Sequence, residues 1–188
     1  MEDTAVIVQK ILSGNSRAFE ILIKEHQRLV NHIVYRMVSD RGDREDVCQD
    51  IFMKVYQNLA GFRSDAKLST WIARIAYNRC IDYLGKNRVS VIDEEFDEAI
   101  AEITDESSTP EKKLLEADLS RLLQNEINDL PIQFRTIVTL YHLDELSYAE
   151  IGDVMSMPEG TVKNYLFRAR RLLRERLTAK YKEEEFRP

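Results

Sequence analysis

The residues best suited to chemistry lie near the C-terminus, in the stretch MPEGTVKNYLFRARRLLRERL from Met157 to Leu177. Lysine, arginine and asparagine side chains can pair with base edges in a DNA major groove, and arginines also neutralise phosphates. The whole chain has a formal net charge of -6, so this cationic segment departs from the overall composition. It therefore indicates binding of nucleic acid. The alternative is a solvated basic face, yet Glu175 is the only acid between Val162 and Leu177 that could pair with it.

Apolar residues recur through this stretch at the spacing of one helix face. Val162, Leu166, Ala169 and Leu173 lie at i, i+4, i+7 and i+11, which predicts that they are buried. The N-terminal end of such a helix lies deepest in the groove, and arginines further along meet phosphates. The residues predicted to contact duplex DNA are Thr161, Lys163, Asn164, Phe167, Arg168 and Arg171.

A second, shorter helix is predicted just before this one. Ser147 and Glu150 have the spacing of a capping box, which starts a helix from Tyr148 to about Met155. After a turn of two residues, Pro158 suits the first position of the next helix. Two helices joined by so tight a turn form a helix-turn-helix.

The rest of the chain predicts an all-α protein that is not an enzyme. Among 188 residues there are only 6 glycines and 4 prolines, and 32% of residues are charged. No nucleophile and base pair, metal cluster or phosphate-binding glycine loop is evident, so we expect no catalytic residue, metal or cofactor. Cys48 and Cys80 are expected to be buried thiols. No apolar run is long enough to span a membrane and the N-terminus is acidic, which favours a cytoplasmic location.

Acidic residues divide the chain into two helical domains. Residues 91–109 are predicted to be an acidic linker, with domains at 1–90 and 110–188. In the first domain we expect helices at 4–12 and 16–38, a third from a cap at Asp43 to Gly61, and a fourth from Ser69 or Thr70 to Leu84, closed by Gly85. In the second, helices are expected from Pro110 to Leu130 and at about 134–143.

The third helix leaves a polar strip outside the core. Val47, Ile51, Val55 and Leu59 recur every four residues and are expected to be buried. The residues left outside are Asp46, Gln49, Asp50 and Met53. An acidic strip suits a basic protein partner, although such a strip is often only a solvated face.

The fourth helix and the loop before it mix basic and aromatic residues. The basic residues are Arg63, Lys67, Arg74, Arg79, Lys86 and Arg88, and the aromatic ones are Phe62, Trp71 and Tyr77. This mixture suits single-stranded DNA, which needs charge neutralisation and a surface for base stacking. The predicted contacts are Arg63, Lys67, Trp71, Arg74 and Asn78. A tryptophan such as Trp71, taken alone, is more often a core residue.

Two long segments resemble one family. LPIQFRTIVTLYHLDELSYAEIGDVMSMPEGTVKNYLFRARRLLRERL resembles region 4, and DREDVCQDIFMKVYQNLAGFRSDAKLSTWIARIAYNRCIDYL resembles region 2, of bacterial sigma factors of the extracytoplasmic-function class. The matches occur in the family's order and cover both domains. One departure is Ser156, where the family often has glycine in the turn; a left-handed serine would cost about 1 kcal/mol.

The resemblance implies a promoter-specificity subunit of RNA polymerase. Region 4 would read the -35 duplex, and region 2 would dock through the third helix on the clamp helices of the largest polymerase subunit. The loop and fourth helix would hold the melted -10 strand, with Asn78 at a position that captures a flipped base. The flap of the second-largest subunit and an anti-sigma protein are further implied partners, and the acidic linker would pass through the polymerase channel. No small-molecule substrate is implied.

Two other functions are compatible with parts of the pattern. A helix-turn-helix regulator that binds duplex DNA as a dimer would need palindromic half-sites and no polymerase. A helical adaptor that binds only proteins would not protect DNA from nuclease digestion, even together with core polymerase.

Overall fold

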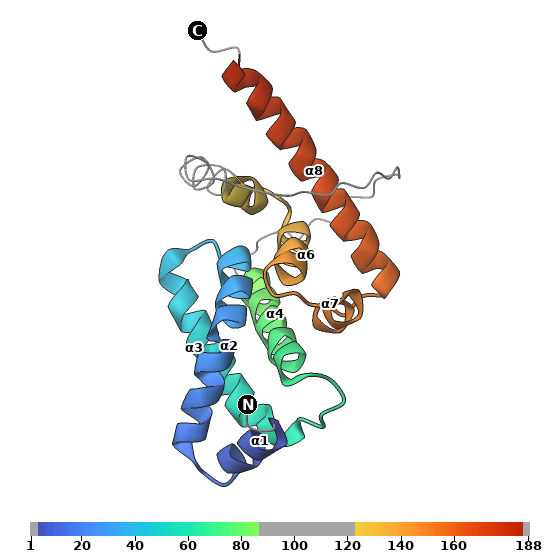
Figure 1. The fold of residues 1–188 in the computed structure, drawn as a ribbon. Coiled ribbons are helices and arrows are strands. Elements are labelled where there is room, and N and C mark those ends of the chain that lie inside the picture. The colour runs from blue at the N-terminus through green and yellow to red at the C-terminus, as the bar shows by residue number, and fades with distance from the viewer. Residues whose placement is uncertain (1–3, 87–122, 186–188) are drawn as a thin grey trace, which may run out of the picture.

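The computed structural model describes residues 4–86 and 123–185, with side chains described up to residue 180. Within these ranges every regular element is a helix, and the helices form two groups that meet near the middle of the molecule (Figure 1). The all-α prediction is confirmed. The predicted acidic linker at 91–109, most of the helix predicted from Pro110, and both domain boundaries lie outside the described residues.

The first group holds four α-helices and one short 3-10 turn: α1 (Thr4–Leu12), α2 (Ser16–Met37), α3 (Arg41–Asn58), η1 (Leu59–Gly61) and α4 (Leu68–Lys86). Gly14, with φ of 89°, lies between α1 and α2, where only glycine adopts this backbone readily. The Asn15 side chain then caps α2 by accepting a hydrogen bond from the Ala18 N–H at 3.1 Å.

Two predicted helix ends are wrong. The N-cap of α3 is Asp40, which accepts a hydrogen bond from the Gly42 N–H at 2.7 Å, and Asp43 lies inside the first turn. The Asp43 carboxylate instead accepts a hydrogen bond from the Tyr83 hydroxyl on α4. Gly85 does not close α4, because it keeps a helical backbone and the helix continues to Lys86.

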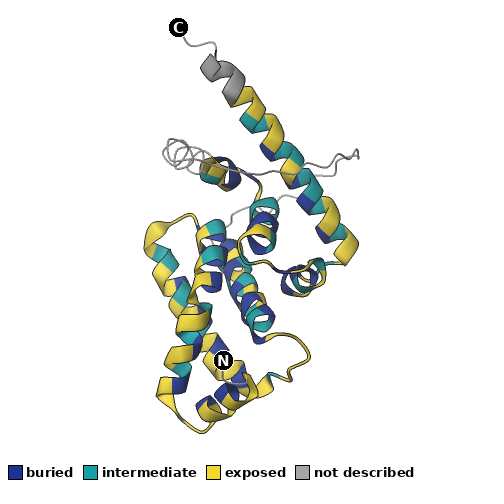
Figure 2. Cartoon of the chain, in the orientation of Figure 1, coloured by how far each residue is buried: buried dark blue, intermediate teal, exposed yellow. Residues whose placement is uncertain are grey.

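The apolar stripe predicted for the third helix lies in the core of this group. Val47, Ile51 and Val55 of α3 and Leu59 of η1 are all buried, and Figure 2 shows the buried residues on the inner faces of the helices. Burial of such a side chain contributes about 1.5–3 kcal/mol. Cys80 is fully buried and the pKa of its thiol rises to about 12, chiefly because burial disfavours the thiolate. Cys48 is only half-buried, contrary to expectation, and its thiol lies 3.4 Å from the Asn31 amide oxygen.

The second group begins with helical residues 123–128, followed by α6 (Ile132–His142), α7 (Tyr148–Met155) and α8 (Glu159–Glu185). Pro131 immediately precedes α6, which begins at Ile132, about two residues earlier than predicted. Glu126 is buried, and its carboxylate pairs with Lys180 from α8. This pair fixes the 123–128 helix against the distal part of α8, which extends away from the rest of the molecule (Figure 1).

The two groups pack against each other, α2 on α6 and α4 on α7. His32 on α2 shares a 2.7 Å hydrogen bond with Asp144, which follows α6. Arg36, one turn further along α2, donates to Thr139 Oγ1 at 3.1 Å, to Asn128 and to Gln124. Burial lowers the pKa of Arg36. Burial also raises the pKa of Asp144, and the hydrogen bond with His32 offsets part of this rise. Polar contacts therefore accompany the apolar packing.

Candidate nucleic-acid interface

The helix-turn-helix has the predicted local geometry. Ser147 and Glu150 form the capping box: the Ser147 hydroxyl accepts from the Glu150 N–H at 3.3 Å, and the Glu150 carboxylate accepts from the Ser147 N–H at 2.8 Å. The helix α7 ends at Ser156, which is left-handed with φ of 56°. Pro158 precedes α8 and its carbonyl accepts the Val162 N–H at 3.1 Å, so it is the N-cap and not the first helical residue as predicted.

The glycine needed in this turn region is Gly152, inside α7. A Cβ at this position would lie 2.8 Å from the Met157 carbonyl oxygen, too close for a side chain without a backbone shift. The Met157 N–H also donates to the Gly152 carbonyl at 3.0 Å. The family resemblance points to a glycine only at the position of Ser156, so the close approach of α7 to the turn at Gly152 was not predicted.

The helix α8 buries the predicted stripe and exposes part of the predicted DNA face. Val162, Leu166, Ala169 and Leu173 are all at most 8% exposed. Among the predicted contacts, Lys163 and Asn164 are exposed, whereas the remaining four are half-buried at the edges of the helix: Thr161, Phe167, Arg168 and Arg171. The most accessible base-reading positions are therefore at the N-terminal end of α8.

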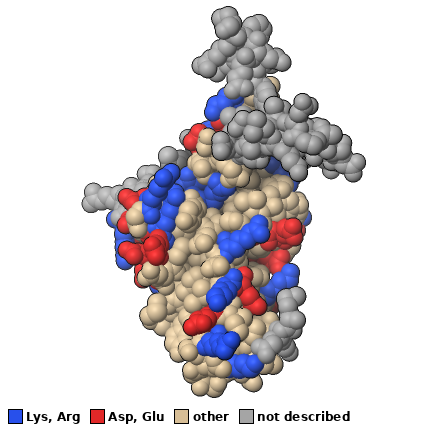
Figure 3. Space-filling model, turned by 60° about the vertical axis from the view of Figure 1, so that its left-hand side comes forward, with Lys and Arg blue, Asp and Glu red and all other residues tan. Residues whose placement is uncertain are grey.

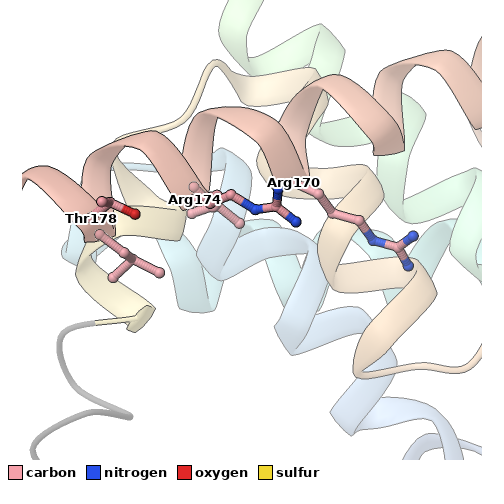
Figure 4. Close-up of a pocket in the computed structure, with 5 residues that line it drawn as sticks. Arg170, Arg174 and Thr178 are labelled. Atoms are coloured by element: carbon pink, nitrogen blue, oxygen red, sulfur yellow. The ribbon is translucent and has the colours of Figure 1, made fainter. Parts of the chain in front are cut away.

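The arginines of α8 divide into packed and projecting ones. Arg168 lies over the Phe134 ring of α6, with 5.5 Å between the guanidinium carbon and the ring centroid. Arg171 is close to Glu175 on the same helix, at 3.7 Å. Arg170 and Arg174 project from one side of α8 beside a shallow hollow (Figure 4). Arg170 donates to His142 Nε2 at 3.3 Å, and burial together with the Arg170 charge lowers the pKa of His142.

The residues predicted to hold single-stranded DNA gather only in part. Trp71, Arg74 and Asn78 line one open hollow of about 360 Å³ between α3 and α4. Trp71 is half-buried, and its ring lies 5.4 Å from that of Phe62. The other residues lining the hollow are Lys54, Asn58, Ile75, Arg79 and Asp82. Of these, only Arg79 belongs to the basic and aromatic set predicted from the sequence. Lys54 and Asn58 come from α3, and Ile75 and Asp82 are residues of α4 that are neither basic nor aromatic.

Two ion pairs join α3 to α4 around this hollow. Arg79 donates to Asp50 Oδ2 through Nη2 at 2.6 Å and through Nε at 3.3 Å. Lys54 and Asp82 approach to 4.0 Å. The mixture of signs is visible over one face of the molecule, where acidic and basic side chains alternate with broad uncharged areas (Figure 3).

Lys67 and Arg63 do not line the hollow. Lys67, in the loop before α4, pairs with Glu150 of α7 at 2.9 Å, so this predicted DNA contact is bound to the other domain. The same pair and the capping bonds hold the pKa of Glu150 at about 2. Arg74 borders a second hollow formed mainly by α7 and its turn. Arg63 is exposed in the loop.

The predicted docking strip lies on the outer side of α3. Asp46, Gln49, Asp50 and Met53 are all exposed, and Met53 is 57% exposed. Tyr56, one turn beyond, is also exposed. An accessible strip of carboxylates next to large apolar side chains is suited to contact with a protein.

Both halves of the chain match one family. Sigma-70 region 2 matches residues 22–89 and Sigma-70, region 4 matches residues 120–173. The ECF RNA polymerase sigma-E factor of Haemophilus influenzae is 33% identical over 91% of this chain and 93% of its own. That of Escherichia coli K12 is 37% identical over 88% and 89%, and the sigma factor SigW of Bacillus subtilis is 31% identical over 90% and 94%. The chain belongs to the extracytoplasmic-function family of RNA polymerase sigma factors.

Solved structures share the fold of this sigma factor. CnrH, in complex with the cytosolic domain of CnrY, has a TM-score of 0.64 at 23% identity, over 93% of this chain and 96% of its own. The sigma factor RpoE of Bartonella quintana, in complex with the anti-sigma factor NepR, also has a TM-score of 0.64, at 22% identity over 85% and 96%.

Family membership makes this chain a transcription-initiation factor and not an enzyme. In the described part of the chain, no helix is long and apolar enough to cross a membrane, and no three candidate ligands come together as a metal site. The dimeric regulator considered from the sequence is not favoured, because the family match includes the first domain as well as the helix-turn-helix.

Proposed function

We propose that this sigma factor reads a -35 duplex with α8 and holds the melted -10 strand in the hollow between α3 and α4. The observation that carries the proposal is that Trp71, Arg74 and Asn78 line the same hollow. An aromatic face, a cation and an amide together can stack a base, neutralise a phosphate and bond a base edge. Arg63 and Lys67 then supply backbone contacts from the loop.

At the -35 duplex, Lys163 and Asn164 at the exposed start of α8 read base edges, supported by Thr161 and Phe167. Arg168 and Arg171 contribute from the edges of the helix, toward phosphates. Replacement of a base-reading residue should cost about 1–3 kcal/mol of binding free energy and relax the sequence preference at one base pair. Replacement of a phosphate contact should weaken all sequences and reduce the dependence on salt.

The polymerase contact is assigned to Asp46, Gln49, Asp50 and Met53, docked on the clamp helices of the largest subunit. Region 4 would contact the flap of the second-largest subunit, and the acidic linker would pass between. We place the protein in the cytoplasm, where polymerase acts. An anti-sigma protein is a further proposed partner, as in the solved complex of RpoE with NepR, whose fold this chain shares.

The packed arrangement of the two domains cannot serve both promoter elements at once. Elements at -35 and -10 are about 25 base pairs apart, which is about 85 Å of duplex at 3.4 Å per base pair. In this structure α7 packs directly on α4. The domains therefore have to separate when the factor joins polymerase, and Lys67 has to leave Glu150.

Transcription in vitro tests the proposal. Core polymerase with this chain should initiate at a defined set of promoters, found by sequencing the transcripts. Asn164→Ala should reduce initiation there without loss of polymerase binding, and Asn78→Ala should impair opening of the -10 region but not binding of the -35 duplex. Equal initiation by core polymerase with and without the chain would refute the proposal.

A further inference from the structure

Arg79 is the most enclosed cation of the hollow between α3 and α4. Its side chain is 15% exposed, and both Nη2 and Nε donate to one oxygen of Asp50. It follows Asn78 directly in the chain and lines the hollow with it. A strand that places its base near Asn78 would thus carry a phosphate past this guanidinium.

Asp50 belongs to two surfaces at the same time. Its side chain is 55% exposed, so a group from outside can reach it while it holds Arg79. It is also part of the strip on α3 assigned to polymerase docking. Lys54, one turn along α3, has a different partner, Asp82, and so does not compete for Asp50.

We propose that Arg79 is an additional contact to the single strand and that Asp50 occupies it until polymerase docks. A basic group of the polymerase that pairs with Asp50 removes the carboxylate from Arg79. The planar guanidinium then has a matching anion in the phosphate of a strand in the hollow. The inference rests on the proposed function of the hollow and of the strip.

Such an exchange makes docking and strand binding cooperative. Coupling between two binding sites is reciprocal, so polymerase raises the affinity for the strand and the strand raises the affinity for polymerase by the same factor. A sigma factor built in this way holds single strands weakly until it is part of the holoenzyme. If the Asp50 pair only ties α3 to α4, its loss changes stability and not this coupling.

The test is a cycle of variants of the full chain. The probe is a fluorescein-labelled single-stranded DNA of random sequence, about 12 nucleotides long, titrated at several salt concentrations. Asp50→Asn retains an oxygen that can accept from Arg79 but removes the charge. It should raise the affinity of the free chain about fivefold and steepen the log-log salt dependence by about 0.7, the value for one phosphate on a single strand.

Arg79→Ala identifies the cation responsible. It should change strand binding by the free wild-type chain less than about twofold, yet cancel the gain caused by Asp50→Asn. With saturating core polymerase, Arg79→Ala should cost about fivefold, because docking has released the guanidinium in the wild type. Urea unfolding of each variant shows whether the domain stays folded, and Arg79→Lys, which keeps the charge without the fork, should recover part of the binding.

Glu45→Gln is the matched control, because Glu45 is an exposed acid on α3 that belongs neither to the docking strip nor to the lining of the hollow. It removes the same charge and should leave the salt dependence unchanged. Equal gains from Glu45→Gln and Asp50→Asn, or an Arg79→Ala effect of the same size with and without polymerase, overturn the inference but not the proposed function. Absence of strand binding by every chain, free or with polymerase, refutes the proposed function and the inference with it.

Discussion

Arg36 is the polar contact between the two domains whose loss should matter most. Its guanidinium donates to Thr139 at 3.1 Å and also to Asn128 and Gln124, three neutral acceptors from the second domain. Hydrogen bonds of this kind contribute about 1 kcal/mol each after exchange with water. Burial of the charge, which lowers the pKa of Arg36, opposes part of that gain. Arg36→Ala should therefore destabilise the packed arrangement of the two domains by about 2 kcal/mol, which changes the equilibrium constant between packed and separated domains by about 30-fold.

The expected consequence is an easier approach to polymerase. If only the separated arrangement binds, apparent affinity is reduced by the fraction of molecules that are separated. Arg36→Ala should then raise the affinity for core polymerase by up to about 30-fold. Energy transfer between dyes at Ser13 and Thr178, one in each domain and both exposed, should fall when the separated form becomes substantial.

Arg36→Lys distinguishes the effect of the positive charge from that of the forked guanidinium geometry. The lysine keeps the charge but lacks the fork that reaches three acceptors, so its effect should be intermediate. Far-ultraviolet circular dichroism should show the same helix content in all three chains. Unchanged polymerase affinity together with unchanged energy transfer in a folded Arg36→Ala chain would refute the role assigned to this residue.

Other contacts give sharper local tests. Gly152→Ala should lower stability by about 1–3 kcal/mol, because its Cβ would meet a backbone oxygen; an unchanged urea midpoint would contradict this. The pKa of His142 in an NMR titration should lie below 6.5, and the Arg170 contact, present above that pH, should be lost as the histidine is protonated on acidification. Glu150→Gln keeps the capping box but should weaken domain closure by at most about 1 kcal/mol, because Lys67 is 75% exposed. The pKa of Glu150 falls from 4.5 to about 2, so the stabilisation that its charge provides is complete above pH 4.5 and is lost on acidification toward pH 2. Energy transfer between the domains, measured at decreasing pH, can follow this loss.

Regular local patterns could be predicted from the sequence. The buried stripe Val47, Ile51, Val55 and the capping box of Ser147 with Glu150 occur where the periodicity and spacing place them. These features depend on residues within about one turn of each other, so a single sequence contains all the information that they need.

Features that depend on distant residues could not be predicted. Asp43 was predicted to be a cap, but it lies inside the first turn of α3, and its carboxylate accepts a hydrogen bond from Tyr83, forty residues later. His32 and Asp144 meet although 112 positions separate them. The contact of Arg168 with Phe134 of another helix could not be predicted for the same reason. A helical pattern shows which side of a helix is apolar, but not which neighbour covers its edges.

Several residues assigned to external partners are already bound within the chain, and the strength of those bonds decides how easily they exchange. Lys67 with Glu150 and Arg79 with Asp50 each include a side chain that is more than half exposed, so either pair is worth about 1 kcal/mol or less. A partner that offers a comparable charge can therefore replace them. Arg36 is different, since burial and three acceptors hold it in place. Exposed pairs at the sites, together with the half-buried Arg36 and the His32–Asp144 contact between the domains, form a molecule that stays closed when alone, yet gives up its binding residues at low cost.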